Sequence, residues 1–465
     1  MKKYFALMSP ISTFSRNLRR QFGTAGLMFV FSIVGFLLAL LLTQFLLKFS
    51  GGCFFGSCHS AAEAQSTPPT QIMYISPTGA GSRNGSSASN AGLLKDLPTF
   101  ITKVGPGGEI RLLNGTYNQP KSMTIASGGV PGKPVTIRGT DASGQETTMP
   151  VIMGNRTSPY QPPSIGKSGD NLFKLLPGAS YLTFRNIHCM NIGNGCFVFA
   201  GSKGNVTIEK TKATNVQRFV EHKPESTSAS GAWEVANVVI RNSEIQGFSK
   251  GAIRFGKPDE KANNSPDAHD ILIQEVFADS QRQDGDNFCM GVHLQGDVHH
   301  VKMIKTTMNN CHQTRKPSDY WNGDGFVAEE HVSDIYFEDT SASGHTDAGY
   351  DIKASNSVLV RTQAADNKRN YRFWSTATVQ DCVGIEPRCR GGRSCQAQVY
   401  VTEKADAKLN RCTFKSTNPT TDVFQSQESG KITVQGGTVE HRGILQKVEG
   451  SPSLIQLNSV TVKLI

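Results

Sequence analysis

Charged residues are scarce in this chain of 465 residues, where Asp, Glu, Lys and Arg together make up 18% of the sequence. No Lys/Arg-rich arm or basic helix is present, so the sequence lacks the electrostatic surface of a nucleic-acid-binding protein. A heptad pattern and a long amphipathic helical pattern are also missing, which excludes a coiled coil. Cysteine pairs with the spacing of a structural zinc site do not occur. These absences favour a β protein without nucleic acid or structural zinc.

Glycine is abundant instead, at 46 residues, and Asn, Ser and Thr are frequent. Residues of these types form the turns of β proteins, so the composition favours short strands joined by turns. A chain of this length would ordinarily form about three domains. A solenoid can take up the same length as one unit, because each repeat contacts only the neighbouring repeats. We therefore expect one large domain.

An apolar run lies near the N-terminus, where no charged residue occurs between Arg20 and Lys48. The run is long enough to span a bilayer as one helix. Basic residues precede it and no acidic residue occurs before Glu63, so the positive-inside rule places the N-terminus in the cytoplasm. A small-residue cleavage motif ends at Ala64, but the run is long for a signal peptide, and we favour an uncleaved signal anchor. The remaining chain is then expected in the periplasm or outside the cell.

Four segments follow from these features. Residues 1–24 are expected in the cytoplasm, 25–48 form the transmembrane signal anchor, 49–70 are a linker and 71–465 form the folded domain. Six of the 48 basic residues belong to the anchor and its flanks, which leaves 42 basic against 38 acidic residues. This mild excess of positive charge is compatible with an acidic polysaccharide as partner.

Short apolar segments recur along the domain at spacings of about 22 to 34 residues, as expected for a solenoid with loops inserted on one side. They are Tyr181–Phe184, Asn205–Ile208, Asn237–Ile240, Asp270–Ile273, His300–Met303, Asp334–Phe337 and Ser357–Val360. Before them, Met73–Gly79 opens a strand, loop, helix and strand progression, and Gly132–Arg138 follows it. This entry resembles that of extracellular right-handed parallel β-helix proteins. The resemblance implies an all-β, single-stranded right-handed parallel β-helix, here preceded by one transmembrane helix.

A second strand can be aligned in each coil, and its third residue points outward because side chains alternate along a strand. The third residues are Val198, Arg254, His293, Val327, Asp351 and Arg372, and Lys353 is outward two residues beyond Asp351. If the coils pair as neighbours, successive members of this column lie roughly 5 Å apart. The column predicts a polar strip that one sugar residue or one metal ion can reach. A surface ion pair of Asp351 and Arg372, worth about 0 to 1 kcal/mol, is the alternative interpretation.

Two motifs stand about one coil apart at this strip, Asn322–Phe326 and Asp347–Asp351. They resemble the paired calcium-site motifs of polysaccharide lyase family 9 pectate lyases. The resemblance implies that Asp324, Asp347 and Asp351 bind calcium, while Ala348 stands where the family carries a further Asp. The loss of one oxygen ligand should weaken the binding of a cation that takes roughly six to eight of them.

The Lys base of this family corresponds to Arg372 within Asn370–Phe373. β-Elimination on a uronate needs a base for the proton beside the carboxylate and a cation for the charge that develops there. Arg is a poor base because its pKa exceeds about 12, whereas Lys353 can lose a proton when desolvated and His293 titrates near neutrality. We expect Arg372, Lys353 and His293 to provide the base and the carboxylate clamp. The residues expected to contact substrate are Arg254, Tyr320, Trp321 and Lys368.

The leading hypothesis is a membrane-anchored polysaccharide lyase that cleaves a uronate-containing polymer by β-elimination, with calcium as the expected cation. A non-catalytic polysaccharide-binding or exopolysaccharide-assembly β-helix is the first alternative, and the departures at Ala348 and Arg372 favour it. A uronate epimerase on the same scaffold is the second alternative. Fold alone does not decide among them.

The cysteines fit a compartment that permits disulfides. Cys289 and Cys311 are 22 residues apart, about one coil, and we expect them to lie close enough for a bridge. Four further cysteines, Cys382, Cys389, Cys395 and Cys412, can form two more bridges in a later loop.

Overall fold

The structure is a computed structural model that describes residues 68–161, 169–223, 234–257, 267–285, 289–393, 396–450 and 454–465. Residues 69–465 belong to one compact unit. The expected anchor at 25–48, the segment 1–24 and most of the linker at 49–70 lie outside the described residues. Within the described part of the chain, no helix is long and apolar enough to cross a membrane.

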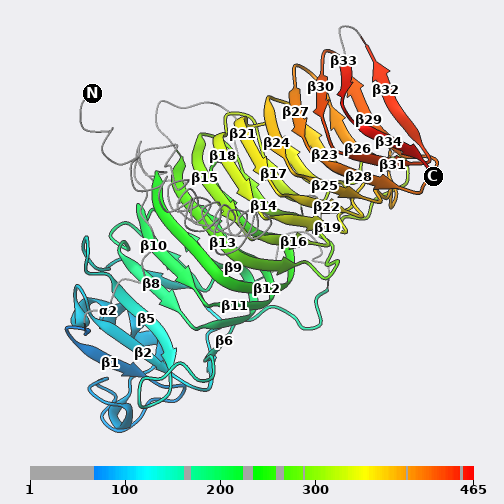
Figure 1. Ribbon diagram of the computed structural model, residues 1–465. Helices are drawn as coiled ribbons and strands as arrows, with labels where there is room; N and C mark the ends of the chain where they lie inside the picture. Colours follow the sequence, from blue (N-terminus) through cyan, green and yellow to red (C-terminus); the bar gives the residue numbers. More distant parts are fainter. Residues whose placement is uncertain are drawn as a thin grey trace, which may run out of the picture. The chain divides into compact units, whose positions relative to one another are not determined.

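The strands form one continuous parallel sheet that is wound into three faces, with the coils stacked from β1 to β34 (Figure 1). Each later coil contributes three strands, one to each of the three faces in turn. The strands of the first face are β4 (Met123–Ile125), β7 (Phe173–Leu175), β14 (Met290–Leu294), β17 (Asp324–Ala328), β20 (Ala348–Ile352), β23 (Arg369–Phe373), β26 (Ala397–Val401), β29 (Asp422–Gln427) and β32 (Ile444–Glu449).

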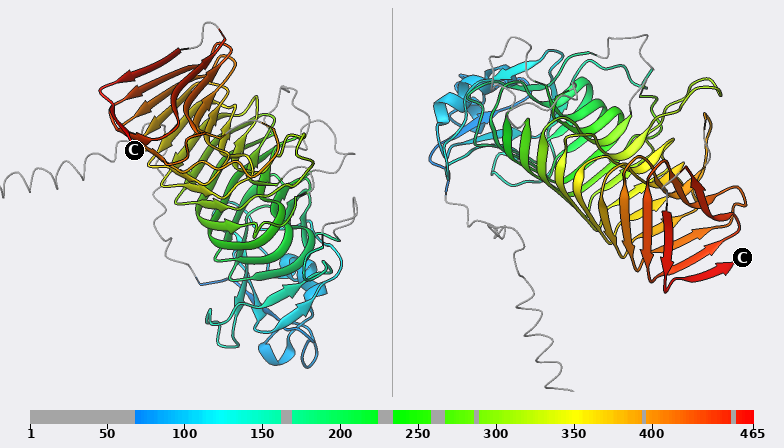
Figure 2. Two further views of the ribbon diagram at one scale, coloured as in Figure 1. Left: turned by 90° about the vertical axis from the view of Figure 1, so that its right-hand side faces the viewer. Right: turned by 90° about the horizontal axis from the view of Figure 1, so that it is seen from above.

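The second face begins at the N-terminal end of the solenoid and runs to its C-terminal end (Figure 2). Its strands are β1 (Ile72–Ile75), β2 (Glu109–Leu113), β5 (Val135–Thr140), β8 (Leu182–Arg185), β10 (Gly204–Glu209), β15 (Val298–Ile304), β18 (Ser333–Glu338), β21 (Ser355–Val360), β24 (Ala377–Gln380), β27 (Asp406–Asn410), β30 (Lys431–Gln435) and β33 (Leu454–Asn458). All seven apolar segments that the sequence marks as coil starts lie at this face, as predicted.

The third face consists of short strands. They are β3 (Thr116–Asn118), β6 (Val151–Met153), β16 (Thr307–Asn309), β19 (Ser341–Ser343), β22 (Gln363–Ala365), β25 (Val383–Ile385), β28 (Thr413–Ser416), β31 (Thr438–His441) and β34 (Thr461–Leu464). Four long strands bend from one face into another: β9 (His188–Phe199), β11 (Lys212–His222), β12 (Val235–Phe255) and β13 (Ala268–Asp279). The chain is therefore a parallel β-helix.

The corners between faces are turned by single residues in the left-handed conformation, which non-glycine residues adopt only rarely. At the entrance to the second face these residues include Asn205, Asn237, Asp270 and His300, with φ between 53° and 56°. Asn and Asp tolerate this conformation better than other residues because their short side chains can hydrogen-bond locally. One such residue at a corner bends the backbone without a longer loop.

The interior is filled by aliphatic and aromatic side chains. Phe326, Tyr350 and Tyr371 stack in successive coils, with ring centroids 5.1 and 5.2 Å apart and nearly parallel planes. The hydroxyl of Tyr350 bonds to that of Thr340 at 2.9 Å, which satisfies two buried polar groups. This aromatic stack lies directly beneath the outward column of the first face, because inward and outward residues alternate.

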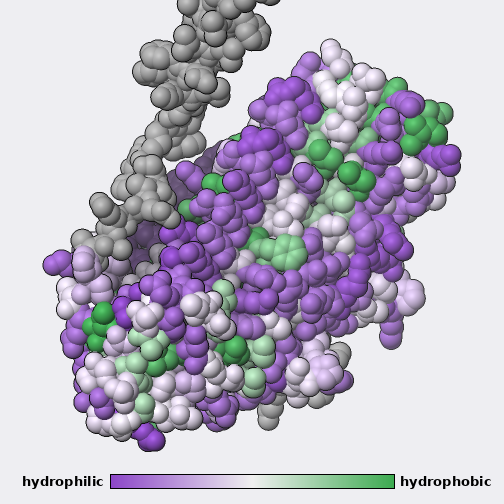
Figure 3. All heavy atoms as spheres, turned by 60° about the horizontal axis from the view of Figure 1, so that its bottom comes forward, coloured by the Kyte–Doolittle hydropathy of each residue, from purple (hydrophilic) through white to green (hydrophobic). Residues whose placement is uncertain are grey.

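The two ends of the solenoid differ. At the N-terminal end, α2 (Leu97–Val104) buries its apolar side, and short 3-10 turns precede it at η2 (Ala88–Asn90) and η3 (Leu94–Asp96). At the C-terminal end, hydrophobic spheres gather over the last coils (Figure 3). Exposed aliphatic side chains there include Ile444, Val448 and Leu464, the last with 74% of its surface exposed. The strands of the last described coil, β32, β33 and β34, pair with β29, β30 and β31 of the coil before it.

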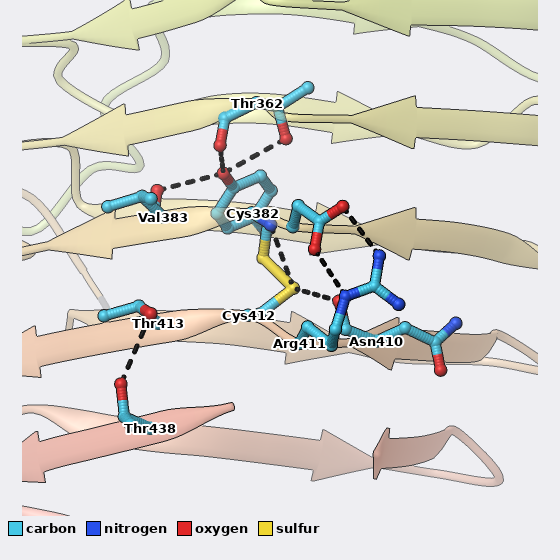
Figure 4. The surroundings of a disulfide bond; sticks show 10 residues. Thr362, Cys382, Val383, Asn410, Arg411, Cys412, Thr413 and Thr438 are labelled. Atoms are coloured by element: carbon cyan, nitrogen blue, oxygen red, sulfur yellow. Dashed lines mark hydrogen bonds and ion pairs between the residues drawn. A yellow bond between two sulfur atoms is a disulfide. The ribbon is translucent and has the colours of Figure 1, made fainter. Parts of the chain in front are cut away.

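One disulfide joins neighbouring coils, between Cys382 and Cys412, whose α-carbons are 4.5 Å apart (Figure 4). The thiols of Cys289 and Cys311 are buried and in contact, as expected, but they are not bridged in the structure. Cys395 lies outside the described residues, so the second bridge expected in the later loop is not described.

Candidate functional site

The outward column of the first face is present as the sequence predicts. Residue by residue, Arg254 pairs with His293, His293 with Val327, Val327 with Asp351, and Asp351 with Arg372. The sequence alignment passed from Val198 directly to Arg254, whereas the structure inserts the coil of Glu221 between them. Beyond Arg372 the column continues with Tyr400.

Arg372 lies between two of the predicted metal ligands. Its Nη1 is 3.3 Å from Asp347 Oδ2, and its Nε is 3.7 Å from Asp351 Oδ1. Burial works to lower the pKa of Arg372, but Asp351 and Asp347 outweigh it, so the pKa is raised overall. The guanidinium is therefore a permanent positive charge between two carboxylates.

Aromatic rings surround this guanidinium. Its carbon lies 4.4 Å from the ring of Trp374, 5.7 Å from that of Tyr400 and 6.0 Å from that of Tyr320. The Trp374 indole also donates a hydrogen bond of 2.7 Å to Asp351 Oδ1. Cation–π contacts of this kind gain strength where water is excluded. They fix the plane of the Arg372 side chain.

Tyr320 reaches the site from the loop between β16 and β17. Its hydroxyl donates to Asp347 Oδ2 and accepts hydrogen bonds of 3.1 Å from both Arg369 and Arg372. Burial and the neighbouring charge of Asp347 raise the pKa of Tyr320. The phenol therefore stays protonated and holds the loop against the first face.

The other predicted substrate contacts are placed differently. Lys368 is fully buried, with its ammonium 4.7 Å from the centre of the Tyr320 ring and bonded to the Arg393 carbonyl. Trp321 rests on the backbone of Gly391 and Gly392, where a Cβ would come within 2.5 to 2.8 Å of the indole. Both side chains support the Tyr320 loop in this arrangement.

His293 occupies a positively charged part of the column. Burial lowers its pKa well below 6.5, and three nearby cations, Arg254, Arg218 and Lys353, add to this effect. The nearest carboxylate oxygen, Glu329 Oε1, is 3.8 Å from His293 Nε2, which is too long for a hydrogen bond. The imidazole is therefore neutral at pH 7 and keeps 16% of its side-chain surface exposed.

Two ion pairs flank this imidazole. On one side Glu221 lies 3.2 Å from Arg218 and 3.5 Å from Arg254, and burial and Arg218 lower the pKa of Arg254 to about 10. On the other side Lys353 donates to Glu329. Burial works against the charge of Lys353, but Asp351 and Glu329 raise its pKa overall. Both flanking cations stay charged at neutral pH.

The predicted calcium ligands do not fit a calcium ion as they are arranged. Both oxygens of Asp347 accept hydrogen bonds, from Arg369 at 3.1 Å and from Arg372 and Tyr320. Asp324 Oδ1 accepts from the Ala348 amide at 2.6 Å, and burial and neighbouring carboxylates raise the pKa of Asp324 well above its usual value. Across the described residues, no group of three or more His, Cys, Asp or Glu side chains is arranged to hold a metal.

Several residues of the site were not predicted from the sequence. They are Arg218, Glu221, Glu329, Arg369, Trp374 and Tyr400. Phe219–His222 has the same alternation as the aligned second strands, so its pattern could have revealed Glu221. Arg369 lies three residues before Arg372, the outward residue of its strand. Side-chain alternation does not place Arg369 at the site, and only the local backbone shows that its side chain faces it.

The fold and the column define a parallel β-helix protein with a charged, aromatic-lined first face. No family model matches the sequence, and no curated protein matches it. Among solved structures, it resembles a pectate lyase, Pel9A, at 11% identity over 83% of this chain and 78% of that one, with a TM-score of 0.34.

Two further solved structures resemble it. An alginate lyase from Paenibacillus sp. is 12% identical over 84% of this chain and 99% of that one, with a TM-score of 0.39. The A-module of an Azotobacter vinelandii mannuronan C-5 epimerase is 11% identical over 79% and 94%, with a TM-score of 0.47. These are likenesses of backbone arrangement, and they leave the chemistry of this chain to its own residues.

Proposed function

We propose that the protein is a polysaccharide lyase that cleaves a uronate-containing polymer by β-elimination at the first face. One observation carries the proposal: a neutral, partly exposed imidazole, His293, stands among cations that stay charged. A base must be unprotonated to accept a proton, and nearby positive charge stabilises the carbanion that this transfer creates. His293 and its neighbours meet both requirements.

In the proposed step the uronate carboxylate lies between Arg254 and Lys353, and His293 takes the proton from the carbon next to that carboxylate. The electron pair forms a carbon–carbon double bond, and the bond to the glycosidic oxygen breaks. The leaving oxygen takes a proton from solvent or from the imidazolium. Atoms and charge balance without an oxidant or reductant.

Arg372 is better suited to bind than to accept a proton. Its pKa is raised, and both carboxylates beside it hold its charge in place. We therefore assign it to positioning and charge, four coils along the column from Arg254. Lys353 has a raised pKa as well, which favours the clamp over the base.

The test is an assay of the purified full-length protein on a panel of acidic polysaccharides, following the ultraviolet absorbance of the unsaturated uronate. His293→Gln should lower kcat/KM by about 10² to 10⁴. His299→Gln, which changes an imidazole on the second face, is the matched control and should leave it unchanged. If the native protein forms no unsaturated product from any polysaccharide of the panel, the proposed lyase activity is refuted.

A non-catalytic polysaccharide-binding protein is the second candidate. It is favoured by the closed network around Asp347, in which the motif residues bond to one another. Retention of an acidic polymer without product, equal in the native protein and His293→Gln, would identify this function. An epimerase would share the proton transfer, and it would exchange solvent hydrogen into the polymer without shortening it.

The location and anchoring remain proposals from the sequence. We propose that residues 25–48 anchor the protein with its β-helix in the periplasm or outside the cell. Membrane fractionation with protease treatment of intact cells or spheroplasts tests this. A β-helix that is recovered in the cytoplasm and protected from protease would contradict the proposal.

A further inference from the structure

The carboxylates of the first face are already neutralised by a cation that belongs to the chain. Asp347 and Asp351 flank the Arg372 guanidinium, and Arg369 Nη1 lies 3.1 Å from the other oxygen of Asp347. Asp347 is 1% exposed, Arg369 is 6% exposed and Arg372 is 12% exposed. A divalent cation brought between these groups would meet two buried guanidiniums at close range.

The ligand oxygens of these carboxylates are also engaged. Calcium needs roughly six to eight oxygen ligands at 2.3 to 2.6 Å. Asp347 has both oxygens in hydrogen bonds, and one oxygen of Asp351 accepts from Trp374. Ala348 contributes a methyl group where a further carboxylate would help. Calcium could enter only by displacing Arg372.

The surroundings of Arg372 are built for an organic cation. Trp374 and Tyr400 turn ring faces toward its guanidinium, at 4.4 and 5.7 Å, and the Tyr320 hydroxyl accepts from it. A planar, weakly hydrated guanidinium is stabilised by aromatic faces, whereas a small divalent ion requires oxygen. A guanidinium and a divalent metal ion therefore need different surroundings, aromatic faces for the first and oxygen ligands for the second.

We propose that Arg372 is a resident cation that supplies the positive charge for which the Asp347–Asp351 motif predicts calcium, so that the native protein needs no metal at this site. The inference deepens the proposed lyase site, because it names the cation of that site. The inference about the cation rests on the side-chain contacts of Arg372 and not on turnover. Its test measures metal binding and thermal stability. A failed lyase assay therefore leaves it standing.

The experiment measures thermal unfolding of the full-length protein in calcium and in chelator, with calcium titrations by calorimetry. The native protein should show the same Tm in both and no saturable heat. Arg372→Ala leaves Asp324, Asp347 and Asp351 without that partner, so its Tm should fall in chelator and recover by several degrees in calcium. Arg361→Ala is the matched control, because it frees Asp339 and Glu338 on an exposed surface.

Saturable calcium binding by the native protein that is lost in Asp351→Asn would overturn the proposal. So would an Arg372→Ala protein that folds but gains no more from calcium than Arg361→Ala does. If Arg372→Ala does not fold, Arg372→Met, which keeps an unbranched apolar stem without the charge, takes its place. If neither folds, calorimetry on the native protein and Asp351→Asn decides.

Discussion

Residues of the same type differ in protonation and burial in this protein because their surroundings differ. His293 lies among cations and loses its proton readily, whereas His300 stands at an exposed corner beside Asp270. Arg372 is enclosed by carboxylates and rings, whereas Arg361 is half exposed. Neither contrast can be read from residue type alone, because side chains from neighbouring coils decide it.

The pH dependence of turnover follows from His293. Its folded-state pKa lies below 6.5, so the neutral, base-competent form dominates from pH 6.5 upward and disappears as the pH falls further. We expect kcat/KM to be flat between about pH 6.5 and 8 and to decline on the acid side. The measurement is kcat/KM on one acidic polymer across this range. An activity that begins to decline already when the pH falls below about 7.5 would contradict this assignment.

At the residue scale, the column could be predicted and its chemistry only in part. Side-chain alternation and the alignment of the second strand of each coil sufficed to place Arg254, His293, Asp351 and Arg372 in line. The protonation states depend on burial, which one sequence does not reveal. Tyr320 was predicted as a substrate contact, but its bonds to two guanidiniums depend on the path of an inserted loop.

Elements in this fold are short because each coil turns three corners. The seven apolar segments marked the second face correctly because each combines a turn residue with a buried strand. The strands of the third face are often three residues long and carry small side chains, so they have no pattern of their own. Their position follows only from pairing with neighbouring coils.

The corner conformation makes a prediction for Asn242. Its φ of 50° lies in the left-handed region, and its side chain is exposed within the bend of β12. Asn242→Val should lower the free energy of unfolding by about 1 to 2 kcal/mol, since a β-branched residue is strained there. Asn242→Gly, the control, adopts this conformation freely. Urea denaturation of the two variants should show the difference, and equal midpoints would argue against strain at the corner.

The aromatic stack makes a second prediction at this scale. Tyr350 is fully buried between Phe326 and Tyr371. Tyr350→Ala should cost about 3 to 5 kcal/mol through the cavity that it leaves. Tyr350→Phe should cost about 1 to 2 kcal/mol, because the Thr340 hydroxyl loses its partner. Tyr336→Phe, on a partly exposed ring, is the comparison. A cost for Tyr350→Ala no larger than that for Tyr336→Phe would contradict the stack's role.

At the scale of the whole molecule, each coil contacts only its neighbours, so stability is a sum over coils and their interfaces. The N-terminal coil is covered by α2, whereas the last coil exposes Ile444, Val448 and Leu464. An open parallel edge of this kind is the weakest interface. Within the described residues, no strand pairs with the outer edges of β32, β33 and β34.

The disulfide should stabilise the C-terminal half. It closes a sequence separation of 30 residues between Cys382 and Cys412. A loop of this size predicts a gain of about 2 to 4 kcal/mol, so Cys382→Ala with Cys412→Ala should lose that amount. The measurement is denaturant unfolding with and without reductant. Reductant should destabilise the native protein and leave the double variant unchanged; an equal effect on both would place the stabilisation elsewhere.

The same bond has a mechanical consequence. A force that pulls on the C-terminus acts on the hydrogen bonds of one coil at a time, since the coils pair in sequence. The coils of β29 to β34 would detach first, and the disulfide would keep the residues between Cys382 and Cys412 from being extended. The strands that carry His293, Asp351 and Arg372 all precede this point. Tension on the C-terminus would therefore extend the last coils first, while the strands of the first face that carry these three residues are still assembled.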